Sequence, residues 1–302
     1  MPALPLITIV TPSYNQGRFI EQTIHSVLSQ DYPKIECLVM DGGSTDDTIR
    51  ILRQFNDEIT WVSEKDLGQA HAINKGFKRA KGEIIAWLNS DDWYIAGTFR
   101  KVADAFARNP QISMVYGEGY HVDENGNRLE RYPTEPFNLE RFRETCYICQ
   151  PTVFLRRSVL DSVGCLDESL HYGLDYDYWI RVGKQLHVLY LPEYLACSRI
   201  YASAKTLRSR VPVHKESIRI MKKHFEGVCS KWIFDYGHAV MESVISRDSL
   251  FKKWVFALGV SCVSSYAFLR HYGRIPRTDI ETMLRWIGGA SRVLFQTRKS
   301  FP

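Results

Sequence analysis

The segment "IIAWLNSDDW", residues 84–93, indicates the fold class because an apolar run ends abruptly in polar residues. Residues 83–88 suit a buried strand, and Asn89, Ser90, Asp91 and Asp92 follow it directly. Two adjacent carboxylates repel each other and resist burial. Their place at the tip of a buried strand therefore predicts a cation or ligand that compensates their charge.

The preceding residues alternate between strand-like and helix-like segments. This order of elements is typical of a mostly parallel sheet covered by helices. The expected strands are 6–10, 35–40, 59–63 and 83–88, and the expected helices are 18–29, 45–55 and 68–80.

Each of these four strands runs into polar, mostly acidic residues. In an open parallel sheet, ligands bind outside the carboxyl ends of the strands. Single Asp, Gly or Ser residues are ordinary in turns, but four such ends together favour a ligand site. Oxygen ligands suit Mg²⁺ or Mn²⁺, which bridge one or two carboxylates to substrate phosphates. The dinucleotide motif G-x-G-x-x-G and the P-loop motif are both absent from the sequence.

The rest of the chain predicts a hairpin, two closing sheet segments and then helices. The sequence changes character near residues 205–212, so we expect a catalytic domain at 1–208 and a helical region at 209–302. The expected elements are a hairpin at 112–122 and 128–132, a strand at 151–157, a helix at 174–184, closing segments at 187–192 and 195–201, and helices at 213–228, 231–245, 249–269 and 278–296.

Composition and charge divide the 302 residues in the same way. Residues 201–302 hold 18 basic and 7 acidic side chains, which fits either a solvated basic surface or a face for an anionic lipid or polymer. Residues 254–269 are too short to span a membrane and predict a buried helix, with an interfacial helix as the alternative. The seven scattered cysteines and the absence of a signal-peptide pattern predict reduced thiols in the cytoplasm.

Two long stretches, "ITIVTPSYNQGRFIEQTIHSVLSQDYPKIECLVMDGGSTDDT" and "GQAHAINKGFKRAKGEIIAWLNSDD", resemble the family 2 glycosyltransferases. The resemblance covers roughly residues 5–205. It implies an α/β GT-A fold, a Rossmann-like, mostly parallel mixed sheet flanked by helices, here with a C-terminal helical extension. It also implies inverting transfer from a nucleotide sugar with Mn²⁺ or Mg²⁺ as cofactor.

The resemblance assigns a nucleotide site and a metal site. Ser90-Asp91-Asp92 matches the family's DxD-type motif, in which Asp92 would hold the metal and Asp91 would meet the ribose or share the metal. Asn89 stands where many relatives have Asp, which leaves the number of metal-binding carboxylates open. The remaining nucleotide-binding candidates are Thr11, Pro12, Tyr14, Asn15, Asp41, Gly42, Gly43, Asp66 and Asn74.

The segment "HYGLDYDYWIRVG", residues 171–183, offers the general base. Asp175 and Asp177 point about 200° apart on a helix, so one of them faces the site. The family pattern favours Asp175 as the base that deprotonates the acceptor. Further candidates for sugar contact are Gln150, Asp177, Trp179 and Arg199, and Tyr201 stands where relatives carry His.

The predicted function is transfer of a hexose or N-acetylhexosamine, with UDP as the favoured nucleotide, to a glycan or lipid-linked acceptor in cell-surface polysaccharide synthesis. Two alternatives stay open, a non-catalytic nucleotide-sugar or glycan-binding relative and a sugar-1-phosphate nucleotidyltransferase. No nucleic-acid partner is expected. A homodimer and a peripheral contact of the basic C-terminal region with the inner membrane face are left open.

Overall fold

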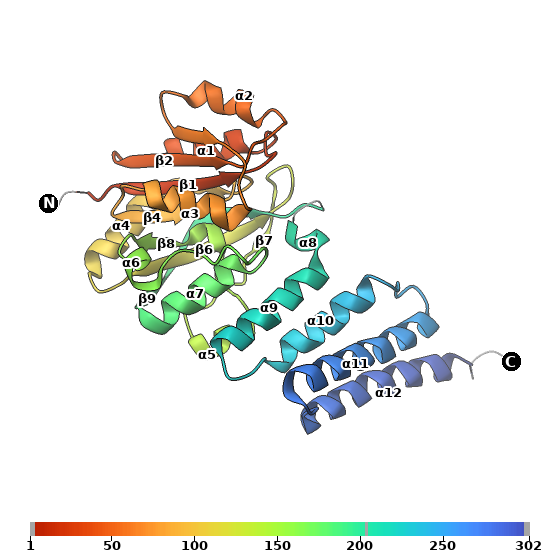
Figure 1. The fold of residues 1–302 in the computed structure, drawn as a ribbon. Coiled ribbons are helices and arrows are strands. Elements are labelled where there is room, and N and C mark those ends of the chain that lie inside the picture. Colours follow the sequence, from red (N-terminus) through yellow and green to blue (C-terminus); the bar gives the residue numbers. More distant parts are fainter. Residues whose placement is uncertain (1–3, 203–204, 299–302) are drawn as a thin grey trace. The chain divides into compact units, whose positions relative to one another are not determined.

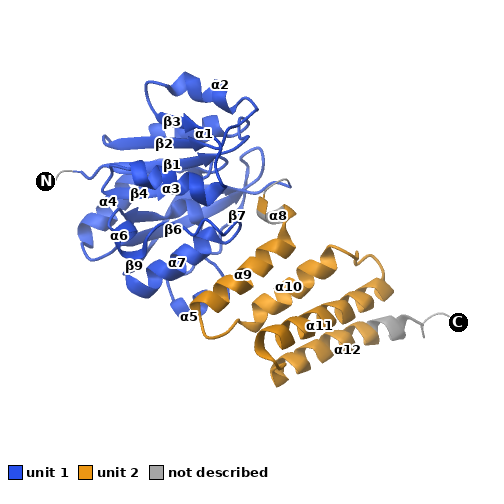
Figure 2. Ribbon diagram, viewed as in Figure 1, with its two compact units in different colours: residues 1–204 blue, residues 205–302 orange. Residues whose placement is uncertain are grey.

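The structure is a computed structural model that describes residues 4–202 and 205–298 (Figure 1). The chain divides into two compact units, residues 1–204 and residues 205–302 (Figure 2). Unit 1 holds the sheet and unit 2 is built from helices.

Unit 1 is one twisted, mixed sheet with the strand order β3-β2-β1-β4-β8-β6-β9-β5, and β7 pairs with β6. The first four strands in this order are parallel, as the alternating sequence predicts. β8 then pairs antiparallel with both β4 and β6. The strands are β1 (Ile7–Ser13), β2 (Ile35–Asp41), β3 (Thr60–Ser63), β4 (Ile84–Trp87), β5 (Trp93–Tyr94), β6 (Met114–Val122), β7 (Arg128–Arg131), β8 (Phe154–Arg156) and β9 (Val188–Arg199).

Helices cover the sheet because each presents an apolar face. On α1, Ile20, Ile24 and Val27 are buried, as the helical spacing of the sequence requires. α3 lies so close to β1 that a Cβ at Gly76 would lie 2.3 Å from a Val10 methyl carbon. The helices of unit 1 are α1 (Ile20–Leu28), α2 (Thr48–Leu52), η1 (Arg53–Phe55), α3 (Gln69–Arg79), α4 (Thr98–Arg108), α5 (Leu139–Phe142), η2 (Gln150–Thr152), α6 (Val159–Val163) and α7 (Leu174–Gln185).

The two closing segments form one continuous strand, β9, instead of the separate segments expected from the sequence. Along β6, the pairing passes from Gly117 opposite Leu191 to Glu118 opposite Tyr194, which leaves Pro192 and Glu193 outside the ladder. Proline has no backbone N–H to donate and is tolerated at such a bulge. The bulge therefore allows β9 to continue past Pro192, where the sequence predicts the end of a strand.

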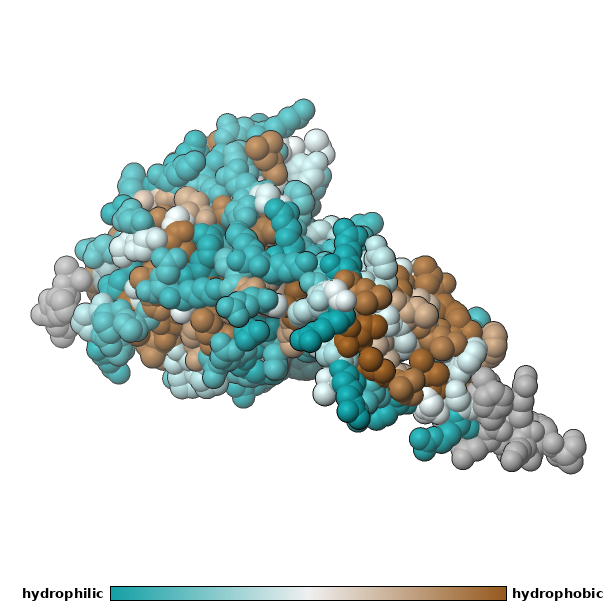
Figure 3. Space-filling model, turned by 60° about the horizontal axis from the view of Figure 1, so that its bottom comes forward, coloured by the Kyte–Doolittle hydropathy of each residue, from teal (hydrophilic) through white to brown (hydrophobic). Residues whose placement is uncertain are grey.

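Unit 2 consists of helices in which neighbours along the chain pack against one another. The expected buried helix is α11, on which Phe256, Val260 and Phe268 are buried while Phe251 and Tyr266 are more than half exposed. Within the described residues, none of the helices combines the length and apolarity that crossing a membrane requires. Hydrophobic side chains gather on the face of unit 2 seen in Figure 3. The helices are α8 (Lys205–Arg208), α9 (Arg210–His224), α10 (Ser230–Glu242), α11 (Leu250–Tyr272) and α12 (Arg277–Arg298).

Candidate active site

The carboxyl ends of three parallel strands carry a row of polar side chains. Ser13, Asp41 and Ser63 are direct register partners on β1, β2 and β3. Asp41 is fully buried, and its Oδ2 accepts hydrogen bonds from the Ser63 hydroxyl at 2.6 Å and from the Gly43 and Ser44 N–H groups at 3.0 and 2.9 Å. Its Oδ1 accepts from the Ser44 hydroxyl. Asp41 therefore holds the turn after β2 in shape.

The loop after β1 is tied to this turn through Asn15. Asn15 adopts a left-handed backbone with φ of 52°, a conformation that Asn tolerates better than most residues. Its N–H donates to the Ser44 hydroxyl at 2.7 Å, and its Oδ1 accepts from the Thr45 N–H at 2.8 Å. Tyr14 projects beside it with 61% of its surface exposed. Thr11 and Pro12 are buried within β1, so they support the loop from below.

Asp66, after β3, packs directly against the turn after β2. Its Oδ1 accepts from the Gly68 N–H at 2.8 Å. A Cβ at Gly42 would lie only 2.7 Å from Asp66 Oδ2, so the close approach of this carboxylate requires glycine at position 42. Asp41, Gly42, Gly43 and Asp66 thus form one compact wall, as the sequence predicts from the strand ends.

Asn89 links the start of α3 and η2 to the loop after β4. Its Oδ1 accepts from Gln69 Nε2 at 2.8 Å, and its Nδ2 donates to Gln150 Oε1 at 2.9 Å and to Asp92 Oδ2 at 3.3 Å. Gln150 in turn donates to the Trp87 carbonyl at 2.9 Å. Asn89 both donates and accepts hydrogen bonds in this network. A carboxylate at this position could only accept, so its partners would have to donate to it instead.

Asp91 and Asp92 lie side by side at the tip of β4. The Asp92 side chain accepts from the Arg199 N–H at 2.9 Å, and Asp91 Oδ2 accepts from the Tyr201 hydroxyl at 2.8 Å. The Thr23 hydroxyl on α1 lies 2.8 Å from the Asp92 carbonyl and 3.0 Å from the Ser90 carbonyl, which fixes the backbone of this loop.

Both carboxylates are held in an environment that disfavours their negative charge. Burial raises the pKa of Asp91 above its usual range. Burial, followed by the charge of Asp91, raises the pKa of Asp92 well above its usual range. A cation between them would relieve both effects.

The residues present fit a divalent cation held by two carboxylates and completed by phosphate or water oxygens. Asp91 accepts one side-chain hydrogen bond and Asp92 accepts two, one on each oxygen, so both keep lone pairs that can coordinate a cation. Among the described residues, no group of three or more His, Cys, Asp or Glu side chains could form an all-protein cage. Tyr201, in the place of the expected His, contributes a hydrogen bond to Asp91 instead of a nitrogen ligand.

Arg199 organises the site from within. Its Nε donates to the Asp91 carbonyl at 2.9 Å, and its terminal nitrogens donate to Glu124 O and Gln22 Oε1, each at 2.6 Å. The guanidinium lies between the rings of Phe19 and Trp93, at 4.4 and 4.8 Å from their centroids. With 7% of its surface exposed, Arg199 has little capacity left for a sugar or a diphosphate.

Three further predicted contact residues are buried and pack against or bind other parts of the chain. Asn74 uses its amide to hold the backbone of Leu166, with both bonds at 3.0 Å. Trp179 stacks on Trp87 at 4.9 Å and is fully buried. Asp177 is fully buried and accepts from Arg181 Nε at 2.9 Å. All three side chains are almost fully buried, and contact of Asn74 with the nucleotide and of Asp177 and Trp179 with a sugar stays a prediction.

Asp175 is placed differently from Asp177, although the two are neighbours on α7. Its side chain is partly exposed, and its Oδ1 accepts from the Tyr176 N–H at 2.8 Å. Its charge contributes to the raised pKa values of Cys146 and Tyr132, where burial is the larger cause, so it lies near both. Residues two apart on a helix point in different directions, so Asp175 is accessible while Asp177 is buried and has a structural role.

Replacing Asp177 with alanine is expected to lower the free energy of unfolding by about 3 kcal/mol, because Arg181 would lose its charge partner inside the protein. Urea unfolding of the purified variant measures the change. Asp161→Ala, on an exposed face of α6, is the matched control and is expected to change stability little. A loss below about 1 kcal/mol for Asp177→Ala would contradict the structural role.

Sequence reasoning missed Thr23 and Gln69. Thr23 reads as part of the apolar face of α1, and only its hydroxyl contacts reveal that it holds the Ser90–Asp92 loop. Gln69 is the first residue of α3, and its side chain donates to Asn89, which follows the carboxyl end of β4. A polar residue on an otherwise apolar helical face was the available signal for Thr23.

Solved glycosyltransferases share this architecture. The S. aureus protein TarS, residues 1–349 in complex with UDP-GlcNAc, superposes with a TM-score of 0.62 at 16% identity, over 95% of this chain and 92% of that one. The mannosyltransferase PcManGT from Pyrobaculum calidifontis, in complex with GDP-Man and Mn²⁺, gives a TM-score of 0.55 at 18% identity, over 96% and 87%. The fold is therefore the GT-A fold, with additional C-terminal helices.

Residues 8–164 match the model of glycosyl transferase family 2, and this chain belongs to that family. An uncharacterized glycosyltransferase of Rickettsia prowazekii is 29% identical over 210 residues, 67% of this chain and 66% of its own. Chondroitin synthase of Escherichia coli is 24% identical over 220 residues, 71% of this chain and 32% of its own. This chain thus spans about two thirds of the first relative and about a third of the second.

Proposed function

We propose that this protein is a metal-dependent, inverting glycosyltransferase that moves a hexose or N-acetylhexosamine from a nucleotide sugar to a glycan or lipid-linked acceptor. The observation that carries the proposal is the Asp91–Asp92 pair. It lies at the tip of β4, beside the turns that follow β1, β2 and β3, and burial raises the pKa of both groups. A site built this way is suited to a cation with a diphosphate.

The relatives support the kind of donor and acceptor. TarS was solved with UDP-GlcNAc and PcManGT with GDP-Man and Mn²⁺, so both of these proteins bind nucleotide sugars. Chondroitin synthase is named for making a polysaccharide. For this chain we favour a UDP-sugar and a role in cell-surface polysaccharide synthesis.

Donor binding would use the wall formed by the strand ends. Exposed Tyr14 is available to pack on a base, while Asp41 shapes the turn of Gly42 and Gly43 rather than offering free oxygens. Asp92 would hold the cation together with Asp91. When bound, a divalent cation neutralises the charge that gathers on the diphosphate leaving group.

The chain's own residues keep this arrangement in place. Asn89 holds Asp92 and Gln150 in fixed orientations, and Arg199 fixes the loop backbone. The Tyr201 hydroxyl directs one oxygen of Asp91. Asp175 is the proposed base, because inverting transfer needs one carboxylate that takes the proton of the acceptor hydroxyl.

A donor screen with and without metal tests the proposal. The protein is incubated with UDP-, GDP- and dTDP-sugars in Mn²⁺ or in EDTA, and the released nucleoside diphosphate is measured. We expect hydrolysis or transfer from one donor class, lost in EDTA. Binding of the nucleotide without turnover on any acceptor would favour a non-catalytic relative, and pyrophosphate release from a nucleoside triphosphate would favour a nucleotidyltransferase.

The helical unit has no assigned part in this reaction. A contact with the acceptor, a homodimer and a peripheral contact at the inner membrane face all remain proposals for residues 205–302. A cytoplasmic location also stays a prediction.

A further inference from the structure

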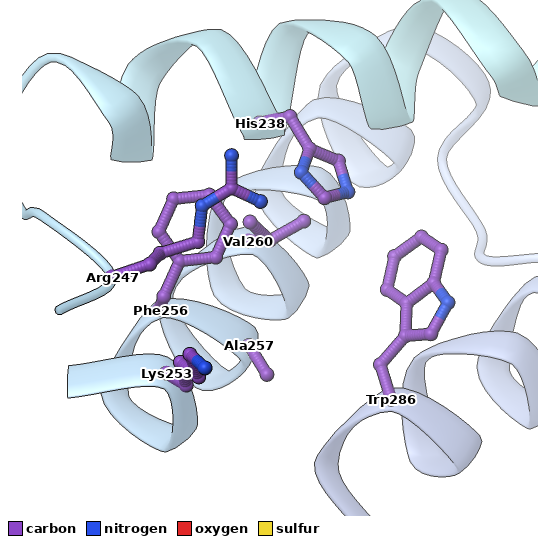
Figure 4. Close-up of a pocket in the computed structure, with 7 residues that line it drawn as sticks. All are labelled: His238, Arg247, Lys253, Phe256, Ala257, Val260 and Trp286. Carbon is purple, nitrogen blue, oxygen red and sulfur yellow. The ribbon is translucent and has the colours of Figure 1, made fainter. Parts of the chain in front are cut away.

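Unit 2 contains a pocket of its own, of about 560 Å³, between α10, α11 and α12 (Figure 4). This volume lies within the range of small-molecule sites. All of the lining residues belong to the helical unit, so the pocket is distinct from the strand-end site. They are His238, Arg247, Lys253, Phe256, Ala257, Val260 and Trp286.

The walls and floor of the pocket are apolar and well packed. Phe256 and Val260 are almost fully buried on α11. Trp286 packs against Phe234 at 4.8 Å and against His238 at 5.6 Å, and it lies across the pocket from Phe256 and Arg247 (Figure 4). The cavity therefore has a fixed aromatic wall that can hold an alkyl or ring portion of a ligand.

Two cations stand at this apolar cavity. The Arg247 guanidinium lies over the Phe256 ring at 4.7 Å and donates to Glu242 Oε1 at 2.9 Å. That single bond leaves most of its N–H donors available within the described part of the chain. Lys253 is exposed, and no described residue forms an ion pair or hydrogen bond with its ammonium group.

The positive charge comes from these two groups rather than from the imidazole. Burial lowers the pKa of His238, so its ring is neutral at neutral pH. Asp235 and Glu242 act on His238 in the opposite direction, and Arg247 and Arg210 act in the same direction as burial. Residues 201–302 also carry 18 basic and 7 acidic side chains, which attracts anions toward this unit.

The hydrogen-bonding groups that line the pocket favour one class of ligand over another. A sugar presents hydroxyls that need acceptors as well as donors, and His238 is the sole lining side chain that can accept. A phosphate group needs only donors, and it matches an Arg and a Lys. An apolar chain attached to that phosphate would match the Phe256, Val260 and Trp286 surfaces.

We propose that this pocket binds a phosphate ester carried on an apolar chain. The phosphate pairs with Arg247 and Lys253, and the chain lies along the wall formed by Phe256, Val260 and Trp286. The proposal does not depend on the transferase activity proposed for unit 1.

The test titrates the full chain with decyl phosphate, inorganic phosphate and neutral decyl maltoside, below the concentrations at which the amphiphiles form micelles. Isothermal calorimetry measures binding, and the fluorescence of Trp286 reports on the pocket through the difference from a Trp286→Phe variant. We expect decyl phosphate to bind at least about tenfold more tightly than either of the other two, and more weakly as salt rises. Equal affinity for inorganic phosphate or for decyl maltoside would overturn the proposal.

Variants locate the site. Lys253→Glu reverses a charge at the pocket, and Ala257→Phe fills its floor without changing charge; each should weaken decyl phosphate binding about tenfold or more. Lys222→Glu, the same charge change at an exposed position on α9, is the control and should bind like the wild type. Circular dichroism confirms folding of each variant. Unchanged binding in both folded pocket variants, or equal weakening in the control, would contradict the assignment.

Discussion

Replacing Asp92 with asparagine is expected to reduce kcat/KM by about a thousandfold or more, because the proposed metal site would lose one of its two charged ligands. Asparagine keeps the shape of the side chain and can still accept from the Arg199 N–H, which in the wild type lies 2.9 Å from the carboxylate. Its Nδ2 would then face the Nδ2 of Asn89, which donates to Asp92 Oδ2 at 3.3 Å in the wild type, so circular dichroism and a thermal melt of the variant separate loss of charge from misfolding. Product formation from the donor identified in the screen, measured over a range of Mn²⁺ concentrations, checks this result.

A second readout separates the metal from the chemistry. Calorimetric titration with the nucleoside diphosphate should show Mn²⁺-dependent binding in the wild type and in Asp57→Asn, a control at an exposed position in the turn before β3. The same binding should be lost in Asp92→Asn. If Asp92→Asn turned over substrate within tenfold of the wild-type rate, the assignment of Asp92 as a metal ligand would be wrong.

The raised pKa of Asp92 also predicts how stability depends on pH without metal. An acid whose folded-state pKa is raised contributes stability that is fully present below its unfolded pKa and is lost as pH rises through the folded pKa. In EDTA, the wild type should therefore lose stability relative to Asp92→Asn as pH rises from about 4 toward neutrality. Thermal melts of the two proteins at matched pH measure this difference, and Mn²⁺ should reduce it.

Replacing Asp175 with asparagine is expected to lower kcat by about a hundredfold to ten-thousandfold, because asparagine cannot take the proton of the acceptor hydroxyl. Its side-chain oxygen can still accept from the Tyr176 N–H, so the start of α7 should remain intact. Initial rates of transfer to the acceptor measure the effect. Metal-dependent binding of the nucleotide should be unchanged, which distinguishes this variant from Asp92→Asn.

The control for Asp175 lies on the same helix. Asp177→Ala should destabilise the protein, whereas Asp175→Asn should melt close to the wild type, because only Asp177 is fully buried against an arginine. An active Asp175→Asn enzyme would place the base elsewhere. A variant that loses stability as strongly as Asp177→Ala would show a structural role instead.

Much of unit 1 could be predicted because its signals are local. The apolar runs that end in Asp41 and in Asp91–Asp92 define parallel strands, and parallel strands bring their carboxyl ends to one edge. Neighbouring turn residues, such as Gly42 beside Asp66, follow from the same alignment. These features depend on residues close in sequence and on the regular geometry of the sheet.

The partners of other side chains could not be predicted, because a motif position does not determine where a side chain points. Asn74 is a predicted nucleotide-binding residue, and its amide holds Leu166, ninety-two residues along the chain. Arg199 is a candidate for sugar contact, and its guanidinium lies over the rings of Phe19 and Trp93. Partners this distant are brought together by chain packing alone, so no local pattern reveals them.

The sequence by itself determined the order of strands and helices, the family resemblance and the acidic strand ends, because periodicity, caps and turn residues act over a few neighbouring positions. The tertiary structure decided which of those residues are available. It placed Tyr201 on Asp91, connected Asn89 to both Gln69 and Gln150, and buried Asp177 while leaving Asp175 reachable. Availability depends on burial and on hydrogen-bond partners far away in the chain, and only the packed fold specifies those.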